Sequence, residues 1–445
     1  MINNAAPALD KPAVEPTITH HRDKVMMLTA TLARMAVGLG TFILLARFLG
    51  PAQYGRIATA IAYSVFVGLA TDFGLATYAF REASAEPADA GKIVGTAVGI
   101  KAVLTIIAVL VGAPFVFSLM PIKYALILVL AFIGTQAGSF ADLAIVVARV
   151  NIRFDLEAKL VVAISAAWLV MVGTVAAVTR DLLAAATAYC FSRLLYVPIS
   201  WWVMRRWFKP GAFMPPIAAM RAMFVKARSY AADNILTVLS GQIDVLLFGL
   251  LLNAHDMGIY QGGARLVQAI VPFAVVLSTV YLRVLSNAAH NKLHSVFQEN
   301  ANRLTLEFSL LAVGAGLSFA VVGPLATQIL YGAQYVTLKP LWAAFGLFAM
   351  LRFASAGYGI QLVALGRIKI RVISQIVSIG LFVGATAIVL PRFGLIAAPW
   401  LLAFSALPSF LLLSFAVRSA KRSGRYVSIS IAAVLAVALL ISILC

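Results

Sequence analysis

Charged residues are scarce in this chain of 445 residues. They make up 11% of it, whereas hydrophobic residues make up 62%. An ordinary soluble domain is about 25% charged and about 45–50% apolar, so this composition cannot supply the surface of a soluble protein. We therefore expect an all-α polytopic membrane protein.

Several chemical signatures are also absent from the sequence. The chain has only two cysteines, Cys190 and Cys445, and both lie in apolar segments, so they predict neither a metal site nor a disulfide framework. No GxxxxGK[ST] nucleotide-binding loop occurs. No loop is long enough to form a catalytic domain. We therefore expect no catalytic residues, no enzyme activity and no bound cofactor, with any work driven by a proton or sodium gradient.

Apolar segments long enough to span a bilayer, roughly 20 residues each, recur along the whole chain. They predict twelve transmembrane helices and a thirteenth at the C-terminus, at residues 25–47, 56–80, 93–118, 122–148, 159–179, 182–204, 230–252, 258–283, 304–331, 340–365, 370–390, 394–417 and 427–445.

The distribution of the 35 Lys and Arg residues predicts the orientation. With the N-terminus in the cytoplasm, most of them fall in inner loops, and the outer loops hold only Arg47, Arg56, Lys123, Arg180, Lys339 and Arg392. The net charge of +19 then faces the anionic lipids of the inner leaflet. We expect a multi-pass protein of the cell inner (cytoplasmic) membrane that contacts membrane lipids and binds no nucleic acid.

Two pairs of segments indicate an internal repeat. LARFLGPAQYGRIATA (45–60) matches GLLLNAHDMGIYQGGARL (249–266) when Gly55 is set on Gly258, which pairs Gly50 with Asn253. ARVNIR (148–153) likewise matches GRIKIR (366–371). Both members of the first pair are predicted to be tight outer turns in which Gly50 and Asn253 accept a positive φ. Convergent loop chemistry is the alternative explanation.

The repeat predicts two pseudo-symmetric six-helix lobes with the same orientation in the membrane. The expected organisation is a cytoplasmic tail (1–24), an N-lobe (25–206), a cytoplasmic amphipathic linker (207–229), a C-lobe (230–418), and a basic loop with the C-terminal helix (419–445).

Ionisable residues within the predicted spans are candidate functional groups, because each costs at least about 2.5 kcal/mol near a helix centre. A cavity lined by cations suits an anionic substrate, and guanidinium groups match phosphate oxygens. Snorkelling to the interface is an alternative for Arg193 and Arg265. The carboxylates are either structural partners of Arg34 and Lys101 or titrating groups that couple transport to an ion gradient. The candidates are Arg34, Lys101, Arg193, Arg265 and Arg352 for the substrate, and Asp72, Asp142 and Asp244 for the ion.

The first repeat segment, followed by DFGLATYAFREAS (72–84), resembles the N-terminal signature of the polysaccharide-exporter family. GQIDVLLFGLLLNAHDMGIYQGGARL (241–266) is similar to the seventh-helix region of the same family. This family contains the Wzx-like O-antigen and exopolysaccharide flippases of the multidrug/oligosaccharidyl-lipid/polysaccharide (MOP) exporter superfamily.

The resemblance implies two lobes that open alternately to each side of the membrane. The implied cargo is an undecaprenyl-pyrophosphate-linked oligosaccharide that moves from the inner to the outer leaflet for surface polysaccharide biosynthesis, with a polymerase or export complex as a further partner. Two alternatives share the fold: a peptidoglycan-precursor flippase, and a multidrug or cation antiporter. A membrane-embedded glycosyl-transfer enzyme is disfavoured by the short loops.

Overall fold

All regular secondary structure in the described part of the chain is helical, which confirms the all-α class. The computed structural model describes residues 21–151, 153–208 and 215–420, with a few positions between 427 and 437. The α-helices are α1 (His21–Asp72), α2 (Leu75–Ala85), α3 (Ala90–Leu119), α4 (Ile122–Val150), α5 (Phe154–Thr179), α6 (Leu182–Met204), α7 (Ile217–Leu251), α8 (Ala254–Ala269), α9 (Val271–His290), α10 (His294–Leu330), α11 (Trp342–Ala364), α12 (Ile368–Phe393) and α13 (Ala397–Ala420).

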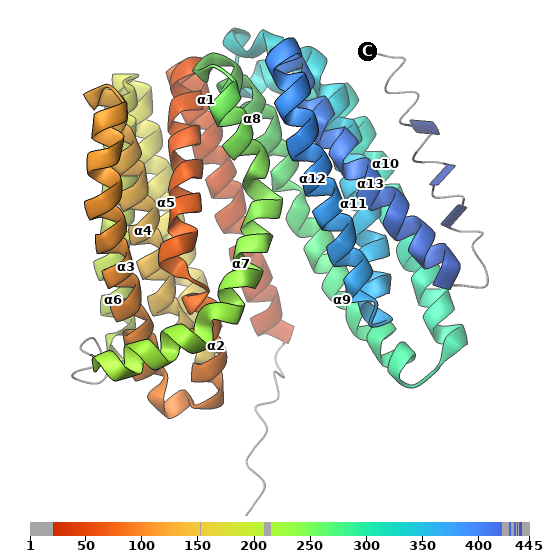
Figure 1. The fold of residues 1–445 in the computed structure, drawn as a ribbon, viewed down its shortest axis with the longest axis horizontal. Helices are drawn as coiled ribbons and strands as arrows, with labels where there is room; N and C mark the ends of the chain where they lie inside the picture. The colour runs from red at the N-terminus through yellow and green to blue at the C-terminus, as the bar shows by residue number, and fades with distance from the viewer. Residues whose placement is uncertain are drawn as a thin grey trace, which may run out of the picture.

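The helices form two lobes, as Figure 1 shows. The first lobe contains α1–α6. The second contains α7–α13, although the N-terminal half of α7 crosses beneath the first lobe. Within the described residues, eight helical segments are long and apolar enough to cross a membrane. Two of them, Leu32–Asp72 and Ile368–Ser419, each cover two predicted spans. The chain is therefore a multi-pass membrane protein.

The first predicted outer turn is a sharp reversal inside α1. Gly50 has φ 73° and ψ 170°, and Pro51 begins the second arm of the helix, a position that suits the fixed φ of proline. The expectation of a positive φ was wrong for the matching residue: Asn253 has φ −69°, and its side chain instead accepts a hydrogen bond from Asp256 N at 2.9 Å. Glycine conformation and side-chain capping thus start equivalent helices by different means.

The two lobes meet where α1 crosses α8, through the two glycines that the repeat pairs. A Cβ added at Gly55 would collide with the backbone oxygen of Ala254, and one added at Gly258 would collide with the backbone oxygen of Pro51. The repeat alignment also pairs Pro51 with Ala254. The pseudo-twofold operation therefore converts the contact between Gly55 and Ala254 into the contact between Gly258 and Pro51. Such reciprocal contacts are the property of a twofold interface, and they support a true repeat over convergent loops.

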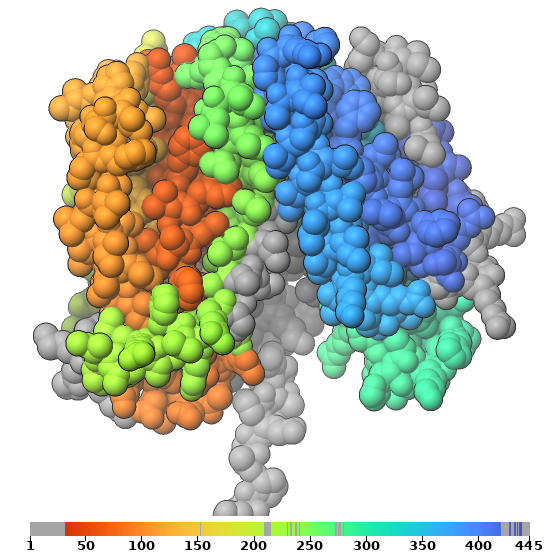
Figure 2. Space-filling model, viewed as in Figure 1, coloured from red at the N-terminus to blue at the C-terminus, as the bar shows by residue number. Residues whose placement is uncertain are grey.

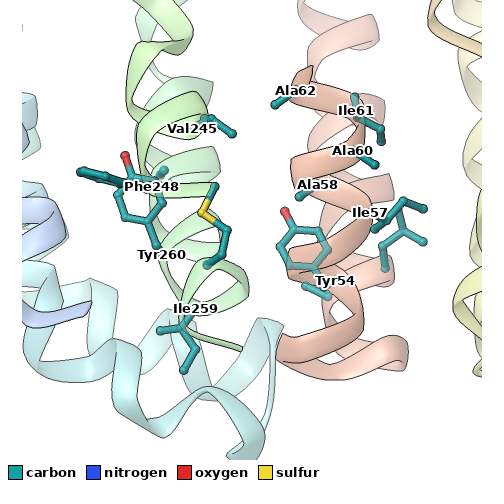
Figure 3. Close-up of a cluster of buried hydrophobic side chains, with 14 of the residues drawn as sticks. Tyr54, Ile57, Ala58, Ala60, Ile61, Ala62, Val245, Phe248, Ile259 and Tyr260 are labelled. Atoms are coloured by element: carbon teal, nitrogen blue, oxygen red, sulfur yellow. The ribbon is translucent and has the colours of Figure 1, made fainter. Parts of the chain in front are cut away.

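A continuous apolar core extends across this crossing and holds the lobes together. Tyr54 and Ile57 of α1 are buried in the same cluster as Phe248 of α7 and Tyr260 of α8. Figure 3 shows the two groups of side chains on facing helices. Figures 1 and 2 show that the lobes touch at the end where α1 and α8 lie together and separate toward the opposite end. The structure is closed at one end and open at the other.

Several helix boundaries differ from the predicted spans. The span predicted at 56–80 ends at Asp72, because Phe73 and Gly74 take positive φ values and α2 begins as a separate helix. The span predicted at 258–283 is divided between α8 and α9 at Ile270, next to Pro272, which cannot donate to the helical ladder. Most of the span predicted at 427–445 lies outside the described residues.

From Ile217 onward, the predicted linker (207–229) and the seventh span form one helix, α7, without a break. Its N-terminal half runs across the open end of the first lobe in Figure 1. Met223 and Ala227 are buried there in a cluster with residues of α2 and α3, whereas Arg221 and Lys226 are exposed. The amphipathic pattern therefore packs the helix on the first lobe and leaves its basic side chains free for water and lipid headgroups.

Candidate functional site

A cavity of about 210 Å³ lies in the first lobe among α1, α5 and α6, and Arg34 and Arg193 both line it. Arg34 Nη2 lies 3.6 Å from Asp142 Oδ2, and the Tyr196 hydroxyl donates to Asp142 Oδ1 at 3.1 Å. The Arg193 guanidinium lies over Trp168, 4.5 Å from the ring centroid. Aromatic stacking and a carboxylate thus hold two cations at one small cavity.

Lys101 is completely buried and lies apart from this cavity. Its ammonium group forms an ion pair with Asp72 and donates to Ser139 Oγ at 2.6 Å, while Ser139 donates to Asp72 Oδ1 at 2.8 Å. The Arg34–Asp142 and Lys101–Asp72 contacts are the pairings that the sequence left open as a structural alternative. Lys101 lines neither this cavity nor the one in the second lobe, and its charge is matched by Asp72.

Arg265 reaches across the interface between the lobes. It projects from α8, and its guanidinium lies 4.4 Å from the ring centroid of Phe42 on α1. Its Nη1 donates to Gln268 Oε1 at 3.3 Å. The side chain is therefore positioned by both lobes.

A larger cavity, of about 530 Å³, lies in the second lobe and is lined by residues of α7, α8, α9, α11, α12 and α13. Arg352 of α11 lies on its wall, 5.9 Å from the ring centroid of Phe348, and Arg371 of α12 lines it as well. Asp244 of α7 is a buried residue on the same wall, and its carboxylate accepts a hydrogen bond from the Tyr260 hydroxyl.

The five predicted cations therefore do not form one cluster. Arg34 and Arg193 share the first-lobe cavity, Arg265 lies between the lobes, Arg352 lies in the second-lobe cavity, and Lys101 is buried apart. In the described part of the chain, no three His, Cys, Asp or Glu side chains gather as metal ligands would. The arrangement offers fixed positive charge in both lobes.

A family model described as polysaccharide biosynthesis protein matches residues 22–289, which is more than half of the chain. The chain belongs to this family. No curated protein matches the sequence.

The fold of this family member is shared with solved transporters at low sequence identity. Lipid II flippase MurJ in an inward closed conformation matches with a TM-score of 0.66 and 14% identity, over 94% of this chain and 98% of that one. A multidrug resistance MATE family transporter of the MOP superfamily, in an inward-facing conformation, matches with a TM-score of 0.64 and 13% identity, over 89% and 98%.

A third neighbour is a MOP superfamily transporter from Pyrococcus furiosus, described as having a binding pocket of reverse polarity. It matches with a TM-score of 0.54 and 14% identity, over 90% of this chain and 97% of that one. The chain thus combines membership of a polysaccharide biosynthesis family with the fold of these solved transporters.

Sequence reasoning missed part of the site of this family member. Arg371, which ends the GRIKIR segment (366–371) and is not among the predicted substrate-binding cations, lines the second-lobe cavity. The serines of that cavity were not singled out. Ser374 and Ser378 on α12, and Ser405 and Ser409 on α13, share a spacing of four residues, which places each pair on one helix face. That spacing was the available signal.

Proposed function

We propose that this protein is a flippase that moves a polyprenyl-pyrophosphate-linked oligosaccharide from the inner to the outer leaflet for surface polysaccharide biosynthesis. Membership of a polysaccharide biosynthesis family supports the pathway, and the two-lobe fold supports alternating access. The observation that carries the chemistry is the pair of arginines, Arg34 and Arg193, at one cavity of the first lobe.

The two arginines suit a pyrophosphate because a guanidinium donates two parallel hydrogen bonds to phosphate oxygens. Arg193 keeps its planar group on Trp168, and its partly exposed side chain lines the cavity. Arg34 is partly neutralised by Asp142, but their separation of 3.6 Å allows an incoming phosphate to compete. Both cations are therefore available to an anion.

The direction of transport follows from the expected orientation. The open end of the two lobes carries the loops that are rich in Lys and Arg, which we assign to the cytoplasm. Cargo then enters from the inner leaflet and leaves when the closed end around Gly55 and Gly258 opens. We infer that a proton or sodium gradient drives this cycle in the cell inner membrane, and that a polysaccharide polymerase or export complex receives the product.

The test is to replace Arg34 and Arg193 by alanine and to measure lipid-linked sugar in each leaflet together with surface polysaccharide. Losing one charge-assisted phosphate contact costs about 1.5–3 kcal/mol, so we expect cargo to accumulate on the inner side in each variant. Arg34→Lys should restore transport only in part. Arg392→Ala, at an exposed site on α12, is the control. Wild-type surface polysaccharide in both cavity variants would refute the assignment.

The runner-up function is a peptidoglycan-precursor flippase, because Lipid II flippase MurJ shares the fold over nearly the whole chain. Complementation experiments distinguish these two functions. A flippase for surface polysaccharide restores the surface glycan of its own host and does not rescue cells depleted of their Lipid II flippase. The opposite result would favour the peptidoglycan precursor.

A further inference from the structure

The wall of the second-lobe cavity is rich in hydroxyl groups. Serines from four helices contribute to it: one from α9, one from α11, and two each from α12 and α13. They are Ser278, Ser355, Ser374, Ser378, Ser405 and Ser409. Ser355, Ser405 and Ser409 are partly exposed, so a ligand in the cavity can reach their oxygens.

The hydroxyl groups of these three serines already donate hydrogen bonds to backbone oxygens. Ser355 donates to Leu351 O at 2.6 Å and Ser405 to Leu402 O at 2.8 Å, both within their own helices. Ser409 donates to the backbone oxygen of Ser374 on the neighbouring helix at 3.1 Å. A serine hydroxyl has one hydrogen and two acceptor sites, so the oxygens of Ser355 and Ser405 remain free to accept. The Ser409 oxygen already accepts from the Ser378 hydroxyl at 2.9 Å and keeps one acceptor site. The wall therefore presents a set of hydrogen-bond acceptors.

Hydrogen-bond donors lie on the same wall. Arg352, Arg371 and Gln375, whose side chains carry N–H donors, line the cavity together with the serines. Phe348, next to Arg352, adds an apolar ring. A ligand that matches this surface carries many hydroxyl groups, which donate to the serines and accept from the cations and the amide.

Other ligand classes fit the cavity less well. A lipid tail would leave the serine oxygens and the guanidinium groups without partners, which is costly in an apolar environment. A cationic drug would meet Arg352 and Arg371, while the carboxylate of Asp244 already accepts a hydrogen bond from Tyr260. The volume of about 530 Å³ lies within the range of about 300–1,000 Å³ that is usual for ligand pockets.

The cavity is also placed at the end of the molecule where the lobes separate. On α12 its lining runs from Arg371, near the start of the helix, to Phe382. α12 begins at the open end in Figure 1. A ligand that enters between the lobes therefore reaches this wall without crossing the closed end.

We propose that the second-lobe cavity binds the saccharide part of the lipid-linked cargo, while the arginines of the first lobe hold its pyrophosphate. This inference rests on the proposed flippase function. In this arrangement Ser355, Ser405 and their neighbours recognise the glycan. Arg34 and Arg193 provide the affinity for the carrier lipid, whichever glycan it bears.

The experiment measures, by native mass spectrometry, which lipid the purified full-length protein retains from a mixture of two. One is undecaprenyl pyrophosphate, and the other is the lipid-linked oligosaccharide fraction extracted from host cells that lack this gene. The wild type should retain the sugar-bearing lipid preferentially. Ser355→Ala combined with Ser405→Ala should lower that preference about fivefold or more, because two acceptors are lost. Arg34→Ala should weaken retention of both lipids.

Ser414→Ala is the matched control. Ser414 also lies on α13 and donates to a carbonyl three residues earlier, Leu411 O at 2.9 Å, but it is buried outside the cavity. An unchanged preference in the double serine variant, or an equal loss of both lipids, would overturn the saccharide site and leave the flippase function standing. If the wild type retains neither lipid, the proposed function itself fails, and the saccharide site with it.

Discussion

Lys101 is a buried charge that we expect to be needed for folding rather than for transport. Lys101→Met would leave the Asp72 carboxylate without its cation, and breaking a buried ion pair costs about 3–5 kcal/mol. The Asp72 side chain is 34% exposed, so we expect the lower end of that range. The double variant Lys101→Met with Asp72→Asn should regain most of the lost stability, as measured by thermal unfolding in detergent.

A surface ion pair provides the comparison for Lys101. On α10, Arg303 Nε lies 3.0 Å from Glu307 Oε1, and the Arg303 side chain is 74% exposed. Arg303→Met should therefore change the melting temperature little. If Lys101→Met melts at the wild-type temperature and still loses transport, Lys101 acts on the substrate after all, as the sequence alone suggested.

Asp244 is the carboxylate whose surroundings best suit ion coupling. Asp72 and Asp142 are each held by a cation, whereas Asp244 is held by the Tyr260 hydroxyl on the wall of a cavity. Asp244→Asn imitates the protonated acid, so we expect gradient stimulation of transport in vesicles to fall about fivefold or more. Asp72→Asn and Asp142→Asn are compared under imposed pH and sodium gradients. Wild-type stimulation in all three variants would place coupling elsewhere.

At the residue scale, the sequence revealed the charges but not their neighbours. Arg34, Asp142, Lys101 and Asp72 stood out because ionisable groups are costly in a bilayer, yet their pairing depends on how α1, α3 and α4 pack. Serine gave a weaker signal, since a hydroxyl can bond to its own helix and is inexpensive to bury. A cavity formed by six helices cannot be read from any one of them.

At the scale of helices, the crossing of α1 and α8 depends on two glycines. Gly55→Ala and Gly258→Ala each place a methyl group against backbone of the other lobe, and overpacking of this kind costs about 1–3 kcal/mol. Because the two contacts are equivalent under the pseudo-symmetry, we expect similar losses of thermal stability from both substitutions.

Two lipid-facing glycines serve as controls for this crossing. An added Cβ at Gly112 of α3 or at Gly380 of α12 meets no atom within 4 Å, so alanine there should be neutral or stabilising through its higher helix propensity. If Gly55→Ala melts at the same temperature as Gly112→Ala, the lobes are not held by this close approach.

Helix existence was easier to predict than helix ends. Apolar length located the spans, because the bilayer requires about 20 such residues. The break after Asp72 and the division at Ile270 depend on single residues with unusual backbone or with proline nearby. The continuity of α7 was missed because its first half is amphipathic and its second half is apolar, so composition changes where the helix does not.

At the scale of the whole molecule, the repeat and the open end together fit the proposed transport cycle. Equivalent glycines meet at the pseudo-twofold crossing that closes one end, and the proposed cycle requires this crossing to part while the opposite end closes. The repeat was visible in the sequence because the crossing requires a glycine at both Gly55 and Gly258. The separation of the lobes was not, since a transporter passes through several arrangements with one sequence.

The orientation of this open end is the last prediction. In a cysteine-free background, Ala52→Cys and His255→Cys place thiols at the closed end, and Ser84→Cys and Asn291→Cys place one in each lobe at the open end. His255, Ser84 and Asn291 are exposed, and Ala52 is partly exposed.

An impermeant thiol reagent applied to intact cells should label the first two positions and reach the others only after the membrane is opened, because basic loops stay in the cytoplasm. The reverse labelling pattern would show that the protein has the opposite orientation in the membrane. The open cavities would then face outward, and loading from the inner leaflet would require the opposite conformation.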